Sequence, residues 1–292
     1  MPGQYCNPQL QCKSRFYSRD QFLSSVQHGL FMIIEEGSYV LLYHSLQKTW
    51  LVEANTGKKF HTHLGVIDLG EAVGSEFGSH LLSSKGKKVI LLEPLVYDFV
   101  MKSERLTQIV YPKDLAYIGI RCGLSSGSRV MEVGTGSGGL TTYLASIVRP
   151  SGHVYTFDVN TKFTAIAKKN IKKANLSDFV TFYDHTQFQE ANCGRVDIVV
   201  IDIGDPWTML EKTYESLKPS GTLVAICPTM NQLEKMSSAL TEFGYVFIDS
   251  IELMIRNIEA RTGKTRPAMR MIGHTTYLIF GRKALQNTSD GH

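Results

Sequence analysis

The sequence lacks the features that mark a membrane or secreted protein. Its 292 residues contain no run of about 18 apolar residues, the length that a membrane-spanning helix needs. The first 19 residues contain no apolar stretch of the kind that forms the centre of a secretory signal. We therefore expect a cytoplasmic protein that makes no membrane contact.

Cysteine is also scarce, and its spacing is irregular. An odd number of scattered cysteines gives neither a disulfide framework nor a zinc-binding pattern, so we expect reduced thiols. His61 and His63 share one face of an extended segment, but no third ligand is evident nearby, and no metal site is predicted. The five cysteines are Cys6, Cys12, Cys122, Cys193 and Cys227.

Neither sign of charge dominates the chain. The 31 basic and 27 acidic side chains leave a net charge of +4, which by itself does not identify a nucleic-acid-binding protein. The distribution is more informative than the total. Residues 256–270 contain five basic side chains against the single acid Glu259, so this segment carries a local excess as large as that of the whole chain.

The residue pattern of the sequence changes near residue 95. Residues 37–44, 48–55 and 87–94 are short β-rich pieces bounded by turn formers, which predicts a small antiparallel barrel or sandwich. Residues 95–104 are typical of a linking helix. We therefore predict a small β-rich domain over residues 1–95, a second domain over 96–285, and a polar, disordered tail over 286–292.

Beyond residue 107, strands alternate with helices of 10 to 15 residues. A helix is predicted over residues 114–124 with Gly123 as its cap, followed by seven strands. This alternation predicts an α/β fold with a doubly wound, mostly parallel seven-stranded sheet. The last two strands, at 245–259 and 275–283, have only a loop between them and are expected to form an antiparallel edge.

A glycine-rich loop follows the first strand of this second domain and opens a helix. Glycines there allow a sharp turn and a close backbone approach to a ligand, whose polar groups face the helix amides. Asp158 ends the next strand, 24 residues after Gly134, where a carboxylate accepts hydrogen bonds from ribose hydroxyls. NAD and S-adenosylmethionine satisfy this pattern equally. The predicted loop contacts are Glu132, Gly134, Thr135, Gly136, Ser137 and Gly138.

Two acidic residues favour S-adenosylmethionine over a dinucleotide. Glu132 stands just before the first glycine, where its charge is expected to repel a pyrophosphate and attract the cofactor's ammonium group. Asp184 follows the third strand and is expected to bind the adenine amino group. The sequence therefore predicts S-adenosylmethionine as cofactor and S-adenosylhomocysteine as its product.

The fourth strand ends in an unusual polar segment, Asp202-Ile203-Gly204-Asp205-Pro206-Trp207. Open α/β sheets bind ligands at the carboxyl ends of their strands. We predict Asp202 as the catalytic residue, which accepts a hydrogen bond from the exocyclic amine of an adenine and so aligns its N1 with the methyl group. Asp202 is counted among the cofactor contacts as well. Pro206 fixes the turn, and Trp207 is expected to wall the substrate pocket.

These motifs, in this order, resemble the tRNA (adenine-58-N1)-methyltransferase family of archaea and bacteria over nearly the whole chain. The resemblance is strongest at residues 107–114, the glycine loop, the Asp-Pro-Trp segment, Arg266-Pro267 and residues 273–275, and residues 62–65 fit as well. It implies a homotetramer whose N-terminal β domain helps to hold tRNA. It leaves open whether adenine 57 is also methylated.

The resemblance also implies roles for individual residues. Thr107 and Gln108 would lie over the cofactor, Tyr111 would stack on the adenine, and His274 would approach the target nucleotide. N1 is buried in a base pair, so the base must be extruded. Phosphate contacts that offset this cost are expected from Arg261, Lys264, Arg266 and Arg270.

Three alternatives stay open at this point. A protein isoaspartyl methyltransferase shares the sheet, the glycine loop and a similar Thr-Gln segment. A corrinoid-precursor methyltransferase shares the sheet but normally lacks the N-terminal domain. A non-catalytic RNA-binding subunit would tolerate loss of the glycine loop and of Asp202, both of which are intact here.

Overall fold

The computed structural model describes residues 32–184, 187, 191 and 193–285. The chain divides into two compact units, Met1–Glu93 and Pro94–His292, and each is described by itself. The tail predicted at residues 286–292 lies outside the described residues, as do Cys6 and Cys12. Among the helices of the described residues, none has the length and apolar character needed to cross a membrane.

The first unit is built from short antiparallel strands. Four of them form a sheet in the order β2-β1-β6-β5, and β3 and β4 form a separate hairpin. Side chains such as Val40, Leu42 and Leu91 are fully buried in a single small core. The strands are β1 (Tyr39–Ser45), β2 (Lys48–Glu53), β3 (Lys59–Thr62), β4 (Gly65–Asp68), β5 (His80–Leu82) and β6 (Lys88–Leu92).

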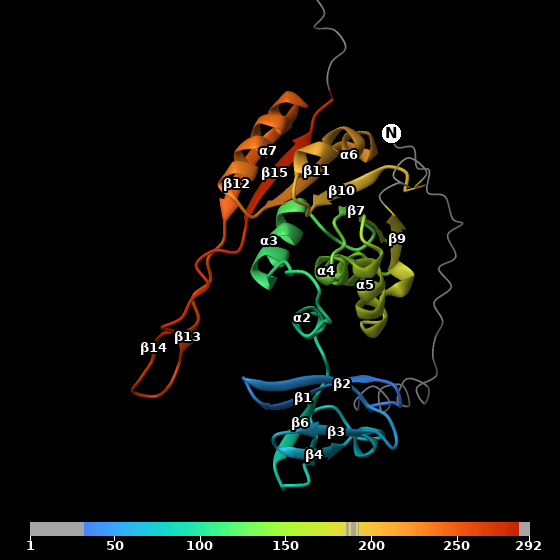
Figure 1. The fold of residues 1–292 in the computed structure, drawn as a ribbon, viewed down its shortest axis with the longest axis vertical. Helices are drawn as coiled ribbons and strands as arrows, with labels where there is room; N and C mark the ends of the chain where they lie inside the picture. The colour runs from blue at the N-terminus through green and yellow to red at the C-terminus, as the bar shows by residue number, and fades with distance from the viewer. Residues whose placement is uncertain (1–31, 185–186, 188–190, 192, 286–292) are drawn as a thin grey trace, which may run out of the picture. The chain divides into compact units, whose positions relative to one another are not determined.

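The second unit contains a seven-stranded sheet in the order β12-β15-β11-β10-β7-β8-β9 (Figure 1). The five strands β7 to β11 are parallel, and β15 runs antiparallel to both β11 and β12. The predicted mostly parallel α/β sheet is therefore confirmed. The strands are β7 (Arg129–Val133), β8 (His153–Asp158), β9 (Val180–Asp184), β10 (Val196–Ile201), β11 (Leu217–Cys227), β12 (Tyr245–Glu252) and β15 (Tyr277–Lys283).

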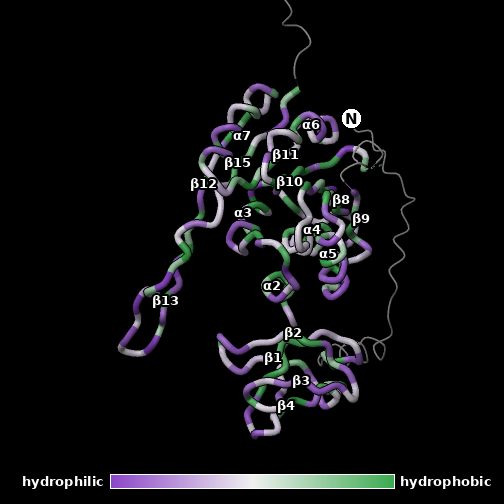
Figure 2. The backbone as a smooth tube through the Cα atoms, in the orientation of Figure 1, coloured by the Kyte–Doolittle hydropathy of each residue, from purple (hydrophilic) through white to green (hydrophobic). Residues whose placement is uncertain are grey.

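Helices cover both faces of this sheet, because the central strands are apolar on both sides. In β10, Ile198 and Val200 join the core under α3, α4 and α5, whereas Val199 and Ile201 join the core under α6 and α7. Figure 2 shows the hydrophobic residues concentrated in these central strands. The helices are α2 (Val96–Met101), α3 (Pro112–Cys122), α4 (Gly139–Val148), α5 (Thr161–Lys173), α6 (Leu210–Ser216) and α7 (Met230–Glu242).

The strand order creates a crevice beside β7. The next strand in sequence, β8, lies on one side of β7, and β10 lies on the other. The connections that follow β7 and β10 therefore lead to opposite faces of the sheet and leave an opening at the carboxyl ends of the strands. Any ligand bound there would meet the residues that follow β7, β8 and β10.

A long excursion separates β12 from β15. Residues 253–276, which we call the arm, contain the two-residue strands β13 (Ile258–Glu259) and β14 (Arg266–Pro267). Figure 1 shows the arm extending away from the seven-stranded sheet. Most of its side chains are exposed, and several of these are large and apolar, among them Met254, Ile258 and Met269.

Candidate functional site

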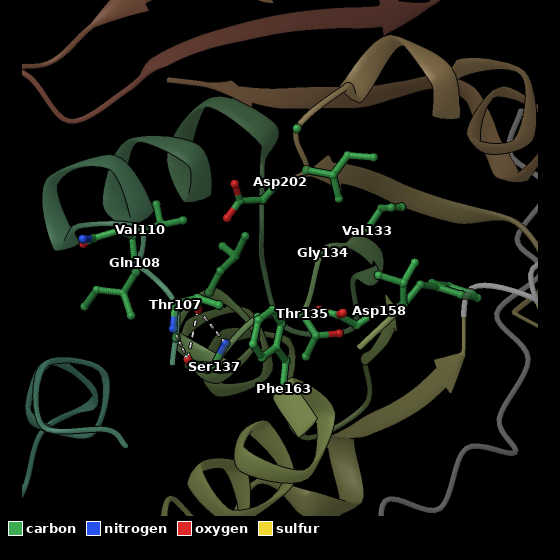
Figure 3. Close-up of a pocket in the computed structure, with 18 of the residues that line it drawn as sticks. Thr107, Gln108, Val110, Val133, Gly134, Thr135, Ser137, Asp158, Phe163 and Asp202 are labelled. Carbon is green, nitrogen blue, oxygen red and sulfur yellow. Dashed lines mark hydrogen bonds between the residues drawn. The ribbon is translucent and has the colours of Figure 1, made fainter. Parts of the chain in front are cut away.

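A cavity of about 460 Å³ occupies the crevice at the carboxyl ends of β7, β8 and β10. Figure 3 shows its lining residues, with Asp202 and Asp158 on opposite sides of Gly134. Of the predicted residues, the cavity gathers Thr107, Gln108, Gly134, Thr135, Gly136, Ser137, Asp158 and Asp202.

Gly134 lets the end of β10 approach the glycine loop. Its φ of 102° is a conformation that residues with side chains rarely adopt. A Cβ atom there would lie 2.0 Å from the carbonyl oxygen of Asp202. Only glycine therefore permits the contact that brings Asp202 to the loop.

Thr107 and Ser137 join the segment before α3 to the glycine loop. Their hydroxyl oxygens lie 3.0 Å apart, and the backbone N–H of Ser137 donates to Thr107 Oγ1 at 3.2 Å. The backbone N–H groups of Leu106 and Thr107 both donate to Ser137 Oγ. Residues 107–110, which form one wall of the cavity, are thus held against the glycine loop.

Asp158 braces the loop and still has capacity for a ligand. Its Oδ2 accepts from the backbone N–H of Gly136 and its Oδ1 from that of Asn160, each at 2.8 Å. A carboxylate oxygen has two lone pairs, so each can also accept a hydrogen bond from a ligand hydroxyl. The contact of Asp158 with a ribose stays a prediction.

Asp202 presents a carboxylate to the other end of the cavity. Its backbone N–H donates to Val133 O at 2.8 Å, which ties the two strand ends together, while its side-chain oxygens have no hydrogen-bond partner among the described residues. Figure 3 shows the carboxylate directed toward the segment of Gln108 and Val110. Burial raises the pKa of Asp202 to about 6, so the group is mainly ionised at neutral pH.

The setting of Glu132 differs from the one that the charge argument assumed. This side chain is fully buried, does not line the cavity, and accepts a hydrogen bond at Oε2 from the Thr141 hydroxyl at 2.6 Å. Its pKa is raised to about 8, mainly by burial and to a smaller extent by the nearby Asp202 and Asp158, while the hydrogen bonds from Thr141 and Thr156 act in the opposite direction. The raised pKa favours the neutral carboxyl at pH 7, which weakens the charge argument, and the contact of Glu132 with the cofactor stays a prediction.

The family model for the tRNA methyltransferase complex GCD14 subunit matches residues 89–269, which is more than half of the chain. The chain belongs to this family. Among curated members of this methyltransferase group, the tRNA (adenine(57)-N(1)/adenine(58)-N(1))-methyltransferase TrmI of Methanocaldococcus jannaschii is 32% identical over 271 residues. That alignment covers 84% of this chain and 95% of the relative.

Solved structures of other methyltransferases share the fold as well. The tRNA (m1A58) methyltransferase TrmI of Aquifex aeolicus aligns with a TM-score of 0.75 and 30% identity, covering 87% of this chain and 100% of its own. A SAM-dependent O-methyltransferase of Thermotoga maritima aligns with a TM-score of 0.82 and 34% identity, covering 87% and 96%.

Within this tRNA methyltransferase family fold, Trp207 is not in the predicted place. Trp207 does not line the cavity beside Asp202. It lines a separate groove along α7, where the Lys235 ammonium lies 4.9 Å from the centroid of the tryptophan ring. The turn begun by Pro206 continues into a 3-10 helix (Pro206–Met209), which carries the tryptophan away from the strand end. Trp207 therefore does not line this cavity, and its contact with the substrate stays a prediction.

Several other predicted residues lie outside the cavity lining. Asp184 ends β9 beside Asp158 in the sheet register, and Tyr111 precedes the first turn of α3. His274 lies at the base of the arm. Arg266 and Arg270 are exposed on the arm, and Arg266 pairs with Glu259 at 3.2 Å.

Sequence reasoning missed some residues that shape the cavity. Phe163 from α5 and Lys212 from α6 both line it. Asn170 lies beneath the loop, where its side-chain amide donates to Ser137 O at 2.8 Å and to Glu104 O at 3.0 Å. The sequence did offer one indication of a special role for Asn170. Asparagine is a poor helix former and is usually exposed, so its place inside a lysine-rich helix is unusual.

Proposed function

We propose that this protein transfers a methyl group from S-adenosylmethionine to N1 of adenine 58 in the T-loop of tRNA. The observation that carries the proposal is the Asp202 carboxylate, which faces the cavity without a hydrogen-bond partner among the described residues. The curated relative from Methanocaldococcus jannaschii acts by name on adenines 57 and 58, so methylation of adenine 57 is a second outcome to measure.

The residues present fit S-adenosylmethionine. Asp158 can accept hydrogen bonds from ribose hydroxyls, and the glycines keep the space beside the loop free of side chains. The cavity volume of about 460 Å³ lies in the range of roughly 300–1,000 Å³ found for ligand pockets. When bound, the cofactor supplies an electrophilic methyl group, and Thr107, Gln108 and Ser137 hold its amino-acid end.

Asp202 orients the acceptor base. N1 of adenine has its own lone pair, so no proton must be removed before transfer, and alignment dominates the rate. The carboxylate accepts a hydrogen bond from the 6-amino group and stabilises the positive charge that develops on the ring. It does so in its ionised form, which exists above its pKa of about 6.

The arm and the N-terminal β unit are proposed to hold tRNA. Arg261, Lys264 and Arg270 are exposed on the arm, where they can reach phosphates and help to offset the cost of extruding the base. Tyr111 and His274 are proposed to contact the extruded nucleotide. Thr62, near the turn between β3 and β4, belongs to the segment of the N-terminal unit that resembles the family.

The assembly is proposed to be a homotetramer that works in the cytoplasm. The arm exposes several large apolar side chains, which supports a subunit contact, because burial of such groups favours association. Light scattering on the purified protein, at several concentrations, measures the mass of the assembly directly. A monomer at all concentrations would remove this proposal.

One assay tests the reaction. Purified protein is incubated with unmodified tRNA and methyl-labelled cofactor, and the labelled nucleoside and its position are determined. We expect 1-methyladenosine at position 58. Label on isoaspartyl peptides offered in parallel, or in a corrinoid precursor, would replace this proposal, and no transfer at all would favour a non-catalytic subunit. The curated relatives do not support these three alternatives.

A further inference from the structure

The side chains of Lys113, Asp114 and Thr275 are hydrogen-bonded to one another where the arm ends and the chain continues into β15. Lys113, in the first turn of α3, donates to Asp114 Oδ1 and Oδ2 at 2.8 and 2.9 Å. It also donates to Thr275 Oγ1 at 2.6 Å, and the Thr275 hydroxyl donates to Asp114 Oδ2 at 3.1 Å. The contact joins residues that are more than 160 positions apart in the chain.

Burial makes this contact more than a surface ion pair. The side chains of Lys113 and Asp114 are 10% and 1% exposed. Desolvating two charges costs free energy that their attraction often fails to recover, so such pairs are weak sources of stability. The hydrogen bonds have strict geometry, however, and they fix one position of the arm base relative to α3.

The same two segments are fixed at further points. The chain before α3 is tied to the glycine loop through Thr107 and Ser137, so the cavity wall at residues 107–110 lies between two anchors. Beside Thr275, His274 places Nδ1 2.6 Å from Glu252 Oε1 and Nε2 2.9 Å from Pro228 O. The hydrogen bonds to Glu252 and then to the Pro228 carbonyl raise the pKa of His274, because both partners favour the protonated ring.

We propose that Lys113, Asp114 and Thr275 form a positioning network that sets where the arm holds the acceptor nucleotide relative to the cavity. The inference rests on the proposed function, and it adds a role for residues that were given none above. None of the three lines the cavity, so they act through placement of the arm and of residues 107–110. Their loss should affect transfer to tRNA much more than cofactor binding.

The test removes one hydroxyl and then restores it. Thr275→Val keeps the shape and deletes the hydrogen bonds, whereas Thr275→Ser keeps the hydroxyl. Thr276→Val is the matched control, because within the described part of the chain the buried Thr276 hydroxyl donates only to the neighbouring Tyr277 carbonyl. For each variant, the cofactor Kd, the thermal midpoint, and kcat and KM for tRNA are measured.

We expect Thr275→Val to lower kcat/KM for tRNA about ten- to a hundredfold, the scale of a small misplacement of reacting groups. The cofactor Kd should stay close to that of the wild type, Thr275→Ser should recover most of the activity, and Thr276→Val should behave as the wild type. Wild-type kinetics in Thr275→Val would overturn the network. So would a parallel loss of cofactor binding and thermal stability, because it would show a purely structural role.

The outcomes separate this inference from the proposed function. If the wild-type protein methylates another acceptor and not tRNA, the proposed function fails, and the inference, which concerns tRNA placement, fails with it. If the wild type methylates tRNA and Thr275→Val does so equally well, only the network fails.

Discussion

The two ends of the cavity are built on different principles. At the cofactor end, Thr107, Ser137 and Asp158 are joined to one another or to the backbone by hydrogen bonds, and Asn170 supports them from below. At the acceptor end, the carboxylate of Asp202 has no hydrogen-bond partner among the described residues. The first end is a preformed receptor, whereas the second keeps one acceptor available at a cost in stability.

Substitutions at the two ends of the cavity should therefore have different effects. A change at the cofactor end disturbs a packed and hydrogen-bonded scaffold, so it should appear in stability and cofactor affinity. A change at the acceptor end removes a group that the folded protein does not itself use, so it should lower the rate of transfer without lowering stability or cofactor affinity. The experiments below separate the two kinds of effect.

The largest effect is expected for Asp202→Ala. Removing one preorganised electrostatic partner of the transition state typically lowers kcat about 10²- to 10³-fold, while cofactor binding should persist. Steady-state kinetics and calorimetric titration measure the two quantities. Asp205→Asn, which changes an exposed carboxylate of the same loop, is the control and should keep full activity. Full activity in Asp202→Ala would remove the role given to Asp202.

Gly134→Ala should damage the scaffold. The added methyl group meets the Asp202 carbonyl oxygen at 2.0 Å in a backbone conformation with φ of 102°. Overpacking of this kind costs about 1–3 kcal/mol in the free energy of unfolding, which denaturant titration measures. Gly204→Ala is the matched control, because nothing lies within 4 Å of its added Cβ. Equal stability of the two variants would contradict the close approach.

Glu132→Gln should flatten the pH dependence of stability. Because burial raises the pKa of Glu132 from 4.5 to about 8, the folded state holds a proton that the unfolded state releases. This contribution is fully present below about pH 4.5 and is lost as pH rises toward 8, at about 1.4 kcal/mol per pH unit. A glutamine does not ionise, so it makes no contribution to stability that changes with pH. Unfolding titrations from pH 5 to 8 test this, with Glu234→Gln as an exposed control. Identical slopes in all three proteins would show that Glu132 is ionised.

The smallest effect is expected on the arm. Replacing Arg261 or Lys264 by Gln removes an exposed charge from the proposed phosphate contact. Each change should weaken tRNA binding severalfold and lower the slope of log affinity against log salt by about one. Filter binding over a range of salt concentrations measures both values. Arg149→Gln, at the start of the turn before β8, is the control, and the same loss there would show only a general charge effect.

The sequence predicted several residues that line the cavity, because their positions follow from local patterns. Gly134 and Ser137 lie in the loop after β7, Asp158 ends β8, and the parallel strands must bring their carboxyl ends to one edge. The residues missed there, Asn170 and Phe163, come from helix faces, and no local pattern states which face meets the loop. The short strands β3, β4, β5 and β14 were also missed, because two to four residues leave little periodicity to detect, and β13 was taken as part of the strand predicted over residues 245–259.

The structure differs from the expectations in the burial and the direction of side chains, which a pattern of residues along the chain does not specify. Glu132 and Asp202 both stand at strand ends, yet one is enclosed and mainly neutral while the other faces the cavity. Trp207 follows Asp202 by five residues, and one turn of 3-10 helix carries it into another groove.

By itself, the sequence determined the α/β alternation, the glycine loop and the strand-end carboxylates, because backbone preference and hydrophobic spacing act over neighbouring residues. Only the tertiary structure decided which carboxylate is charged and which segments meet. Burial sets the cost of charge, and contacts such as that of Lys113 with Thr275 join residues distant in the chain.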